Sequence, residues 1–365
     1  MSRETAVYRG VDELPADVVE LLDSAERESL TFGLPWYRNF LGSVAQPDDR
    51  VRFHVLRRDG RALVVLPVFE RGGGLPLHAR IEALGNYYTS LYAPAVDAAA
   101  DDEDMSALLH SMRRRLPWLA SLRLQPMDRD SRAYRLLLAG LRRAGLLPFE
   151  FYCFGNWFLR VPADWAAYLA SRTSKMRSNI KRMEKKLADD GGSVEIIVDR
   201  EHHARAVEAY ERVYASSWKP QEPYPGFMPG LIARAGEGGW LRLGVVWLKG
   251  QPIAAQVWMV ANGKADIYKV AYDEAFKDYS PGTVLTAQLM RHVIEQDRVT
   301  EVDYLIGDDA YKKTWMSDRR ERWGVVAYNP RTLAGALGAL RETLGRRLKP
   351  LVERLKARRK PASET

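Results

Sequence analysis

The fold of this chain is decided by residues 267–311, IYKVAYDEAFKDYSPGTVLTAQLMRHVIEQDRVTEVDYLIGDDAY. The β-forming runs 267–271 and 302–306 predict two strands, and the apolar spacing of 283–297 predicts a helix between them. A short turn, KDYSPGT at 277–283, leads into that helix. Because the free backbone N–H groups and the dipole of a helix start point the same way, this order predicts an anion site that a pyrophosphate would fit.

A similar order of elements occurs twice along the chain. The C-terminal half is expected to read strand, helices, three strands, helix, strand, short helix and strand. The N-terminal half is expected to read helix, hairpin, helix, strand, helix and strand, with a hairpin signal at Asp59-Gly60. No repeat is visible in residue identity, so the predicted duplication rests on element order alone.

Length and composition set broader limits. At 365 residues the chain is expected to form two domains. Its net charge of +8 favours anionic partners such as phosphorylated cofactors, nucleic acid or anionic lipid. The single cysteine, Cys153, rules out an internal disulfide and fits a reducing compartment. The sequence has no apolar leader and no run of bilayer length, which predicts a cytoplasmic protein.

The turn and its surroundings resemble a known family. The acyl-CoA-binding turn of the GNAT N-acetyltransferases reads Arg/Gln-x-x-Gly-x-Gly/Ala. Lys277 takes the first of these places, Ser280 that of the first Gly, and Gly282 that of the second small residue. The wider runs 272–283 and 307–315 resemble GNAT-like proteins of the CelD type. That group is associated with cellulose and exopolysaccharide biosynthesis and is related to the tandem-domain Fem ligases.

The resemblance is clearest over residues 171–323 and implies a domain organisation. It implies an α/β chain with mixed sheets and two GNAT-like acyl-CoA N-acyltransferase domains in tandem, the N-terminal one degenerate. The expected division is 1–160 for the degenerate domain, 161–330 for the acyltransferase domain and 331–365 for a basic amphipathic tail.

The resemblance implies acetyl-CoA, or another acyl-CoA, as the co-substrate. The residues expected to bind it are Lys277, Ser280, Pro281, Gly282 and Thr283. In the family the pantetheine lies where the two predicted strands splay apart, and a backbone N–H polarises the thioester. An ordinary helix start also carries Pro in its first turn and Ser or Thr at its cap, so that alternative stays open.

Three candidate catalytic residues, Asp308, Asp309 and Tyr311, directly follow the second predicted strand. The resemblance implies that one aspartate takes a proton from the acceptor amine and that Tyr311 returns one to the CoA thiolate. An aspartate needs a raised pKa to act as a base near neutral pH. The alternative is that Asp308 caps a short helix that contains Tyr311.

Four further residues are candidates for acceptor binding. Arg177 and Asn179 lie on a strongly basic predicted helix, 172–187, of a kind that the resemblance includes. Trp218 lies in an aromatic and proline-rich loop expected to overhang the acceptor, and Gln256 lies on a predicted central strand. A solvated helix face and plain loop packing are the alternatives for these positions.

The tail 333–360 has leucines at helical spacing opposite arginines and lysines. Pro350 is expected to kink or split this helix. A helix of this composition suits an anionic membrane surface. The commoner explanation is docking on the protein's own surface.

These predictions describe a cytoplasmic enzyme that transfers an acetyl or other acyl group from CoA to an amine by direct attack. The resemblance suggests a small-molecule or saccharide amine, such as an amino sugar in envelope or exopolysaccharide synthesis. No metal-site or serine-hydrolase motif is found, so no metal is expected, and no obligate protein partner is evident. Two alternatives stay open: a Fem-like ligase that takes an aminoacyl group from tRNA, and a non-catalytic GNAT relic that binds RNA, lipid or a synthase complex.

Overall fold

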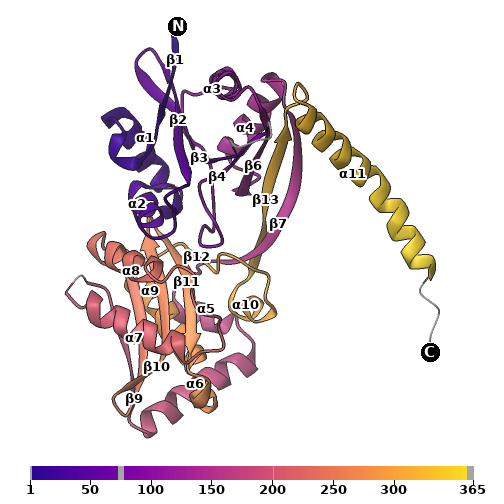
Figure 1. The fold of residues 1–365 in the computed structure, drawn as a ribbon. Helices are drawn as coiled ribbons and strands as arrows, with labels where there is room; N and C mark the ends of the chain where they lie inside the picture. The colour runs from indigo at the N-terminus through magenta and orange to yellow at the C-terminus, as the bar shows by residue number, and fades with distance from the viewer. Residues whose placement is uncertain (1, 73–77, 200, 360–365) are drawn as a thin grey trace. The chain divides into compact units, whose positions relative to one another are not determined.

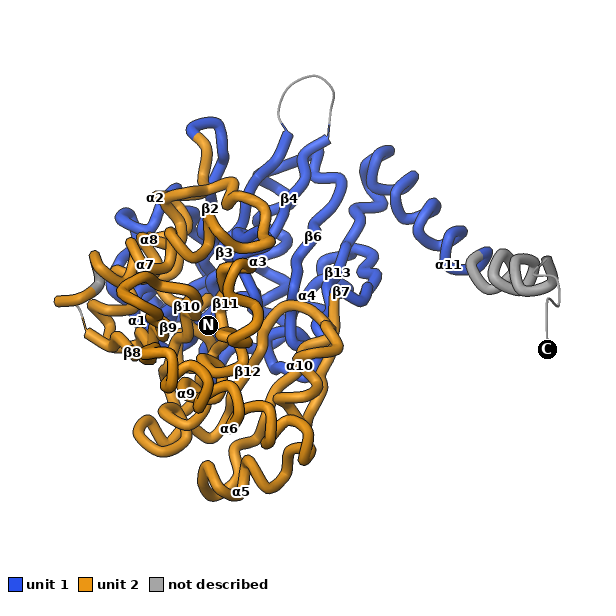
Figure 2. Tube along the Cα trace, turned by 90° about the horizontal axis from the view of Figure 1, so that it is seen from below, with its two compact units in different colours: residues 1–25, 47–153, 322–365 blue, residues 26–46, 154–321 orange. Residues whose placement is uncertain are grey.

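The computed structural model describes residues 2–72, 78–199 and 201–359, leaving aside the side chains of 203 and 349–359. The chain forms two compact units, and each is assembled from separate stretches (Figure 2). Unit 1 comprises residues 1–25, 47–153 and 322–365, and unit 2 comprises residues 26–46 and 154–321.

Unit 1 is a mixed sheet with helices packed against it. Its elements are β1 (Arg3–Tyr8), η1 (Val11–Glu13), α1 (Ala16–Glu26), β2 (Arg50–Arg58), β3 (Arg61–Arg71), β4 (Ala79–Ala83), β5 (Ala95–Val96), α3 (Asp102–Arg115), β6 (Leu119–Asp128), α4 (Arg132–Arg143) and α11 (Leu333–Arg359). Its core is apolar and fully buried, with Leu109, Leu124 and Leu137 among its members.

Unit 2 has the same kind of architecture. Its elements are η2 (Leu30–Phe32), α2 (Leu34–Ser43), α5 (Trp165–Ala170), α6 (Ser174–Asp189), β8 (Gly192–Ile197), α7 (His203–Ala215), α8 (Phe227–Glu237), β9 (Leu241–Leu248), β10 (Gln251–Ala261), β11 (Lys264–Tyr272), η3 (Glu274–Tyr279), α9 (Pro281–Glu295), β12 (Glu301–Asp303) and α10 (Ala310–Trp315). Its core includes Trp258, Leu285 and Leu289.

The two units repeat one pattern of strand pairing. In unit 1, β1 to β4 pair antiparallel in order, β4 pairs parallel with β6, and β6 pairs antiparallel with β13. In unit 2, β8 to β11 pair antiparallel in order, β11 pairs parallel with β12, and β12 pairs antiparallel with β7. The prediction of an α/β fold with mixed sheets is confirmed, and the duplicated element order has a counterpart in the pairing.

The last strand of each pattern comes from the other part of the sequence. Strand β7 (Leu147–Arg160) follows α4 of unit 1, yet its end at Phe158–Arg160 pairs with β12 of unit 2. Strand β13 (Asp318–Tyr328) follows α10 of unit 2, yet it pairs with β6 of unit 1 from Arg322 onward. This exchange, together with the place of residues 26–46 in unit 2, is why the compact units are not the continuous ranges 1–160, 161–330 and 331–365.

Helix α2 belongs to unit 2 although it lies early in the sequence. The Asn39 side chain donates a hydrogen bond to the Phe227 carbonyl, with Nδ2 and O 3.1 Å apart. The Trp36 ring packs edge-on against the Phe227 ring, with centroids 5.5 Å apart. Because these contacts join residues almost 190 positions apart, no local pattern in the sequence signals them.

Helices cover both faces of the unit 2 sheet (Figure 1). Helix α9 packs on β9, β10 and β11, while α7 packs mainly on β10 and contacts α8. Side chains alternate along β11, so that Val270 and Gln256 of β10 lie on the α9 face. Lys269 lies on the other face, with its ammonium 5.9 Å from the ring centroid of Tyr214 of α7.

A buried carboxylate joins four strands of unit 2. Asp303, the last residue of β12, is fully buried. It accepts hydrogen bonds from Asn156 Nδ2 of β7, at 2.5 Å, and from the Arg320 guanidinium of β13. The Lys264 ammonium of β11 lies 3.2 Å from Oδ2, the oxygen that also accepts from Arg320. A carboxylate can stay charged inside a protein only when it is paired and hydrogen-bonded in this way.

The same carboxylate ends β12. Asp303 Oδ1 accepts the Leu305 N–H at 2.7 Å, and Leu305 has a φ of 53°, in the left-handed region. The chain therefore leaves the extended conformation, and the predicted strand 302–306 is wrong beyond Asp303. Pairing between β11 and β12 stops at Asp266 opposite Asp303. Residues 267–272 of β11 are thus left with β10 as their only strand partner within the described part of the chain.

The tail forms one helix, α11, which is not split at Pro350. Its leucines do not dock on unit 1, because Leu333, Leu337, Leu340, Leu344 and Leu348 are exposed. The helix nevertheless packs on β6 of unit 1. The expected docking on the protein's own surface therefore occurs, but through other residues of the helix than these leucines. Among the described residues, no helix combines the length and the hydrophobicity needed to span a membrane.

Replacing Asp303 with Ala should lower the free energy of unfolding by about 3–5 kcal/mol, because Arg320 and Lys264 would lose a buried anion. Asp308→Ala is the matched control, since Asp308 also pairs with an arginine, Arg319, at an exposed carboxylate. Its loss of stability should be much smaller. Urea unfolding followed by circular dichroism measures both variants, and equal small losses would contradict the role given to Asp303.

Candidate functional site

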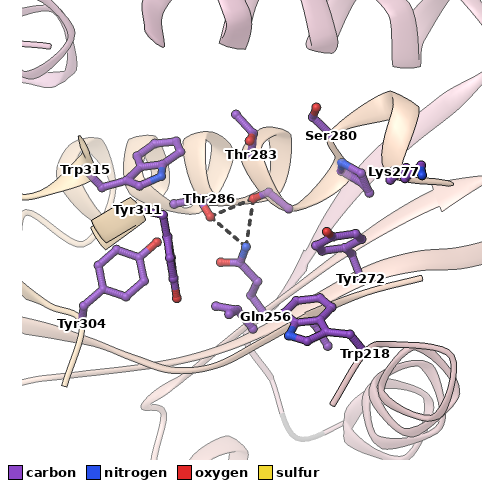
Figure 3. Close-up of a pocket in the computed structure, with 14 residues that line it drawn as sticks. Trp218, Gln256, Tyr272, Lys277, Ser280, Thr283, Thr286, Tyr304, Tyr311 and Trp315 are labelled. Atoms are coloured by element: carbon purple, nitrogen blue, oxygen red, sulfur yellow. Dashed lines mark hydrogen bonds between the residues drawn. The ribbon is translucent and has the colours of Figure 1, made fainter. Parts of the chain in front are cut away.

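A cavity of about 370 Å³ lies beside β11, beyond the point where β12 has ended (Figure 3). We call it the turn cavity. Its lining residues are Trp218, Gln256, Val270, Ala271, Tyr272, Lys277, Ser280, Pro281, Gly282, Thr283, Thr286, Tyr304, Tyr311 and Trp315. The cavity thus brings together the five residues predicted to bind the cofactor and three more of the predicted site residues, namely Trp218, Gln256 and Tyr311.

Ser280 gives the turn its shape. The residue has φ 45° and ψ 49°, the left-handed conformation that glycine adopts without strain. The serine thus holds the backbone shape at the place where the GNAT turn has its first Gly, at a cost of about 1 kcal/mol. Its side chain makes no capping hydrogen bond to α9. The start of the helix is therefore not closed by its own cap.

The first turn of α9 fits an anion. Pro281 has no N–H, and the Gly282 N–H has no hydrogen-bond partner among the described residues. A Cβ at Gly282 would meet only Tyr272, at 3.5 Å, so the space on the side-chain side of this residue is open. The helix is 15 residues long with no acidic residue in its first turn, and Lys277 lines the same cavity. The positive end of the dipole and a nearby lysine suit a pyrophosphate.

Gln256 forms the floor of the cavity and holds α9 in place. Its Nε2 donates to the Gly282 carbonyl at 3.1 Å and to Thr286 Oγ1 at 2.8 Å (Figure 3). Its Oε1 accepts the Trp258 indole N–H at 2.9 Å. Both N–H groups of the Gln256 amide and one lone pair of its oxygen are therefore used in hydrogen bonds within unit 2. Gln256 thus fixes the start of α9 to the sheet, on the α9 face.

The free edge of β11 and two aromatic rings complete the cavity walls. Trp218, from the loop after α7, packs on Tyr272 with ring centroids 4.7 Å apart. Val270 and Ala271 line the cavity from the part of β11 that pairs only with β10. Backbone N–H groups on such an edge can polarise a carbonyl oxygen placed beside them.

Tyr311 lies at the α10 end of the cavity. Its ring packs edge-on against that of buried Tyr304, with centroids 5.7 Å apart. Burial of the hydroxyl and, second, the negative charge of Asp309 raise the pKa of Tyr311 to about 12. The phenol therefore carries its proton at neutral pH and can donate it to a basic leaving group.

The two candidate aspartates differ in their surroundings, and neither lines the turn cavity. Asp308 is held by Arg319, with Nη2 and Oδ2 2.7 Å apart, and hydrogen bonding from this guanidinium lowers the pKa of Asp308. A lowered pKa is the opposite of what a base requires. Asp309 begins α10 without a side-chain cap bond and lies 3.2 Å from the Lys312 ammonium. The N-cap position of α10 is thus Asp309 rather than Asp308, and no side-chain capping bond is formed there.

Lys312 is a site residue that the sequence reasoning missed. Its ammonium is buried and donates to the carbonyls of Ile306 and Gly307. Burial lowers the pKa of Lys312, and the charge of Asp309 opposes that effect. The ammonium holds the loop between β12 and Tyr311 in shape. In the sequence, Lys312 is one of two adjacent lysines that follow Tyr311, and no pattern there indicates which of the two is buried.

A second cavity, of about 400 Å³, lies on the α7 and α8 side of unit 2, and we call it the loop cavity. Its lining residues are Tyr210, Glu211, Tyr214, Ala215, Lys219, Gln221, Glu222, Pro225, Met228 and Pro229. The Lys219 ammonium has no ion pair or hydrogen bond among the described residues and lies 5.7 Å from the Trp218 ring and 5.9 Å from the Tyr214 ring. Lys269, in contrast, pairs with Glu222 at 2.7 Å.

Lys219 has an unusual electrostatic environment. Burial, followed by the positive charge of Lys269, lowers the pKa of Lys219 to about 8. The charges of Lys312 and Asp309 also act on it. The ring of Trp218, which lines the turn cavity, lies 5.7 Å from the ammonium. An anion bound beside Lys219 would relieve the repulsion between these cations.

Arg177 and Asn179 lie on α6, away from both cavities. Arg177 donates to the Arg172 carbonyl, and Asn179 Oδ1 accepts from Arg182 Nη2 at 3.0 Å. These contacts are local and exposed. The helix reaches the turn only near its C-terminal end, where the Lys186 ammonium donates to the Asp278 carbonyl at 3.1 Å.

Comparison with known families identifies the domain that contains the turn cavity. Residues 174–313 match the family described as acetyltransferase (GNAT) domain. The chain carries a GNAT acetyltransferase domain. No curated protein matches the sequence.

Solved structures extend the likeness to almost the whole chain. The structure of FemX is similar at a TM-score of 0.64 and 14% identity, covering 93% of this chain and 99% of that one. The C-terminal domain of a putative lysylphosphatidylglycerol synthetase from Agrobacterium fabrum is similar at 0.52 and 15% identity, covering 90% and 97%. A protein of unknown function from Bacteroides thetaiotaomicron is similar at 0.52 and 11%, covering 83% and 97%. At these identities the likeness concerns the fold alone.

A Gly282→Trp variant should lose acetyl-CoA binding, because the indole would fill part of the turn cavity, which Gly282 lines. Gly282→Ala is the control and should bind within a few-fold of the parent, since its methyl group makes only an ordinary contact with Tyr272. Isothermal titration calorimetry with acetyl-CoA measures both. Equal binding by the parent and the Trp variant would place the cofactor elsewhere.

Proposed function

We propose that the GNAT domain transfers an acyl group, most simply acetyl, from an acyl-CoA to the amine of an anionic acceptor. The observation that carries this proposal is the turn cavity. It combines an uncapped helix start, a free strand edge and a protonated tyrosine within one space of about 370 Å³. These are the groups that thioester aminolysis needs for pyrophosphate, carbonyl oxygen and leaving thiolate.

The residues of the chain have separate tasks in this proposal. The Gly282 amide and Lys277 bind the pyrophosphate, and the free edge of β11 polarises the thioester carbonyl. The acceptor nitrogen attacks directly, so that its bond to the acyl carbon forms as the carbon–sulfur bond breaks. Tyr311 gives its proton to the departing thiolate, and Asp309 receives the amine proton through water. Asp308 has no catalytic role in this proposal, because its carboxylate forms an ion pair with Arg319.

The acceptor is proposed to occupy the loop cavity. The Lys219 ammonium lies there without an anionic partner of its own, and the half-buried ring of Tyr214 suits a sugar face. We therefore propose an amino sugar that carries a phosphate or carboxylate. An acceptor of this kind agrees with the resemblance to the CelD type and with envelope or exopolysaccharide synthesis. A cytoplasmic location remains a prediction from the sequence.

Unit 1 has features that support its assignment as the degenerate copy. Helix α3 occupies the place in unit 1 that α9 has in unit 2, between the parallel-paired strands β4 and β6. Its start is closed by the Asp101 carboxylate, which accepts the Asp104 N–H at 2.9 Å in a capping box. The first turn of α3 is acidic throughout. A pyrophosphate would be repelled there.

The proposal is tested by measuring thiol release from acetyl-CoA with three acceptors: glucosamine, its phosphate ester, and the carboxylated amino sugar muramic acid. Faster release with either anionic sugar than with glucosamine supports the proposed acceptor class. The better of the two identifies the anion. Release with none of them, from protein that binds acetyl-CoA, would overturn the acceptor class while leaving the cofactor assignment in place.

Tyr311→Phe should lower kcat by about a hundredfold or more with little change in acetyl-CoA affinity, because the ring remains and the donated proton is lost. Tyr279→Phe is the control, since the Tyr279 hydroxyl bonds Asp190 outside the cavity. The two variants are compared by thiol release and calorimetry. An unchanged kcat in the Tyr311 variant would remove this residue from the proton transfer.

Lys219 predicts a pH dependence with a definite sign. Its pKa of about 8 means that it is charged below pH 8 and neutral above it. The KM for an anionic acceptor should therefore rise about tenfold per pH unit above pH 8. Lys219→Arg should remove this rise, because arginine stays charged. Lys219→Gln should raise KM about tenfold to a hundredfold at pH 7.

The opposite profile would reassign Lys219. Lys219 would be a general base if kcat/KM increased as the pH rises through 8 and if this increase were absent from the arginine variant. In that case the acceptor need not be anionic.

The Fem-like ligase is the second candidate, supported by the exposed basic surface of α6, which includes Lys175, Lys181 and Arg182. Under this reading an aminoacyl-tRNA replaces the acyl-CoA. A folded protein that binds no acetyl-CoA but transfers the aminoacyl group of a charged tRNA would favour the ligase. Salt-sensitive RNA binding without transfer would favour the non-catalytic relic.

A further inference from the structure

Helix α11 packs on unit 1 through its small residues. Gly335 and Ala339 are buried, and a Cβ at Gly338 would lie 2.5 Å from the ring of Tyr328. On the same side, the Arg346 guanidinium donates to the Glu150 carbonyl at 2.6 Å. Because these residues are small, the helix backbone can lie close to unit 1. The face of α11 that contacts the protein is therefore the one with the glycines and the alanine.

The opposite face of α11 is a stripe of exposed leucines. Leu333, Leu337, Leu340, Leu344 and Leu348 are 79%, 56%, 54%, 47% and 51% exposed. At about 100° per residue they fall within an arc of roughly 80°. A helix that only completed the fold would turn this stripe inward and its glycines outward. The observed arrangement is the reverse, so the stripe is a surface for something outside the chain.

Cations flank the leucine stripe on both sides. Arg341 and Arg347 are exposed and fall at its two edges on the helical wheel. The acidic residue of this part of the helix, Glu342, points the other way and pairs with Arg346 at 2.9 Å. From 331 to 360 the sequence contains ten Arg or Lys and two Glu.

We propose that the leucine stripe of α11 binds an anionic lipid surface, with the helix lying in the plane of the membrane interface. Leucines enter the acyl boundary while flanking arginines meet lipid phosphates, the arrangement of an interfacial helix. A second copy of the chain is a poorer occupant. Joining two stripes would bring Arg341 and Arg347 of both copies together, with no acid at the edges to pair with them. This inference does not depend on the acyltransferase proposal.

The test is co-sedimentation of the full-length protein with vesicles of phosphatidylcholine alone or with about 30 mol% phosphatidylglycerol. The protein should sediment with the anionic vesicles and be released as salt is raised from about 0.1 to about 0.5 M. A Leu340→Glu, Leu344→Glu double variant should lower the partition coefficient about tenfold or more. The control is Leu147→Glu, Val198→Glu, which places the same charges at exposed apolar positions elsewhere and should bind like the parent.

Because both leucines are exposed, the double variant should melt at the same temperature as the parent. Failure of the parent to bind anionic vesicles would overturn the proposal, as would equal binding by the parent and the double variant. Sedimentation velocity without lipid measures the oligomeric state of the parent and of the double variant. A dimer that is lost only in the Leu340 and Leu344 variant would assign the stripe to a second copy instead.

Discussion

The buried carboxylate of Asp303 is the constraint on which the site of this protein depends. Its bonds to Asn156, Arg320 and Lys264 tie four strands together, and its bond to the Leu305 N–H bends the chain away from β11. Strand pairing ends at the same residue, and the free edge of β11 begins there. One buried charge thus both stabilises unit 2 and opens the space beside β11. A substitution of Asp303 is therefore expected to affect both the stability of unit 2 and the shape of the turn cavity.

Strand β11 lies between two cavities with different chemistry. Val270 lines the turn cavity on the α9 face, where a helix start and Lys277 favour an anionic cofactor. Lys269 lies on the other face beside Lys219, Glu222 and the rings of the loop cavity. Direct transfer requires the two reactants to meet across the edge of one strand, and Tyr311 at the α10 end is placed near that edge.

The sequence predicted the parts of this structure that depend on local chemistry. Strand 267–271, the turn at 277–283 and the helix after it were predictable because β-forming residues, Pro and Gly act within a few positions. The end of β12 was not, because Asp303 bends the chain only when Arg320 and Lys264 make its burial possible. Lys219 was not predicted either, since its lowered pKa comes first from burial and then from the charge of Lys269, and both depend on the tertiary fold. The strand exchange of β7 and β13 lay equally beyond any local pattern.

The central claim is that an acyl-CoA binds along the free edge of β11 and against the start of α9. Hydrogen–deuterium exchange with and without acetyl-CoA tests it most directly, because amides on an edge without a strand partner exchange readily until a ligand covers them. The account predicts protection of residues 267–272 and 282–284, with little change in α3 of unit 1. Protection confined to unit 1, or none at β11 under saturating acetyl-CoA, would contradict it.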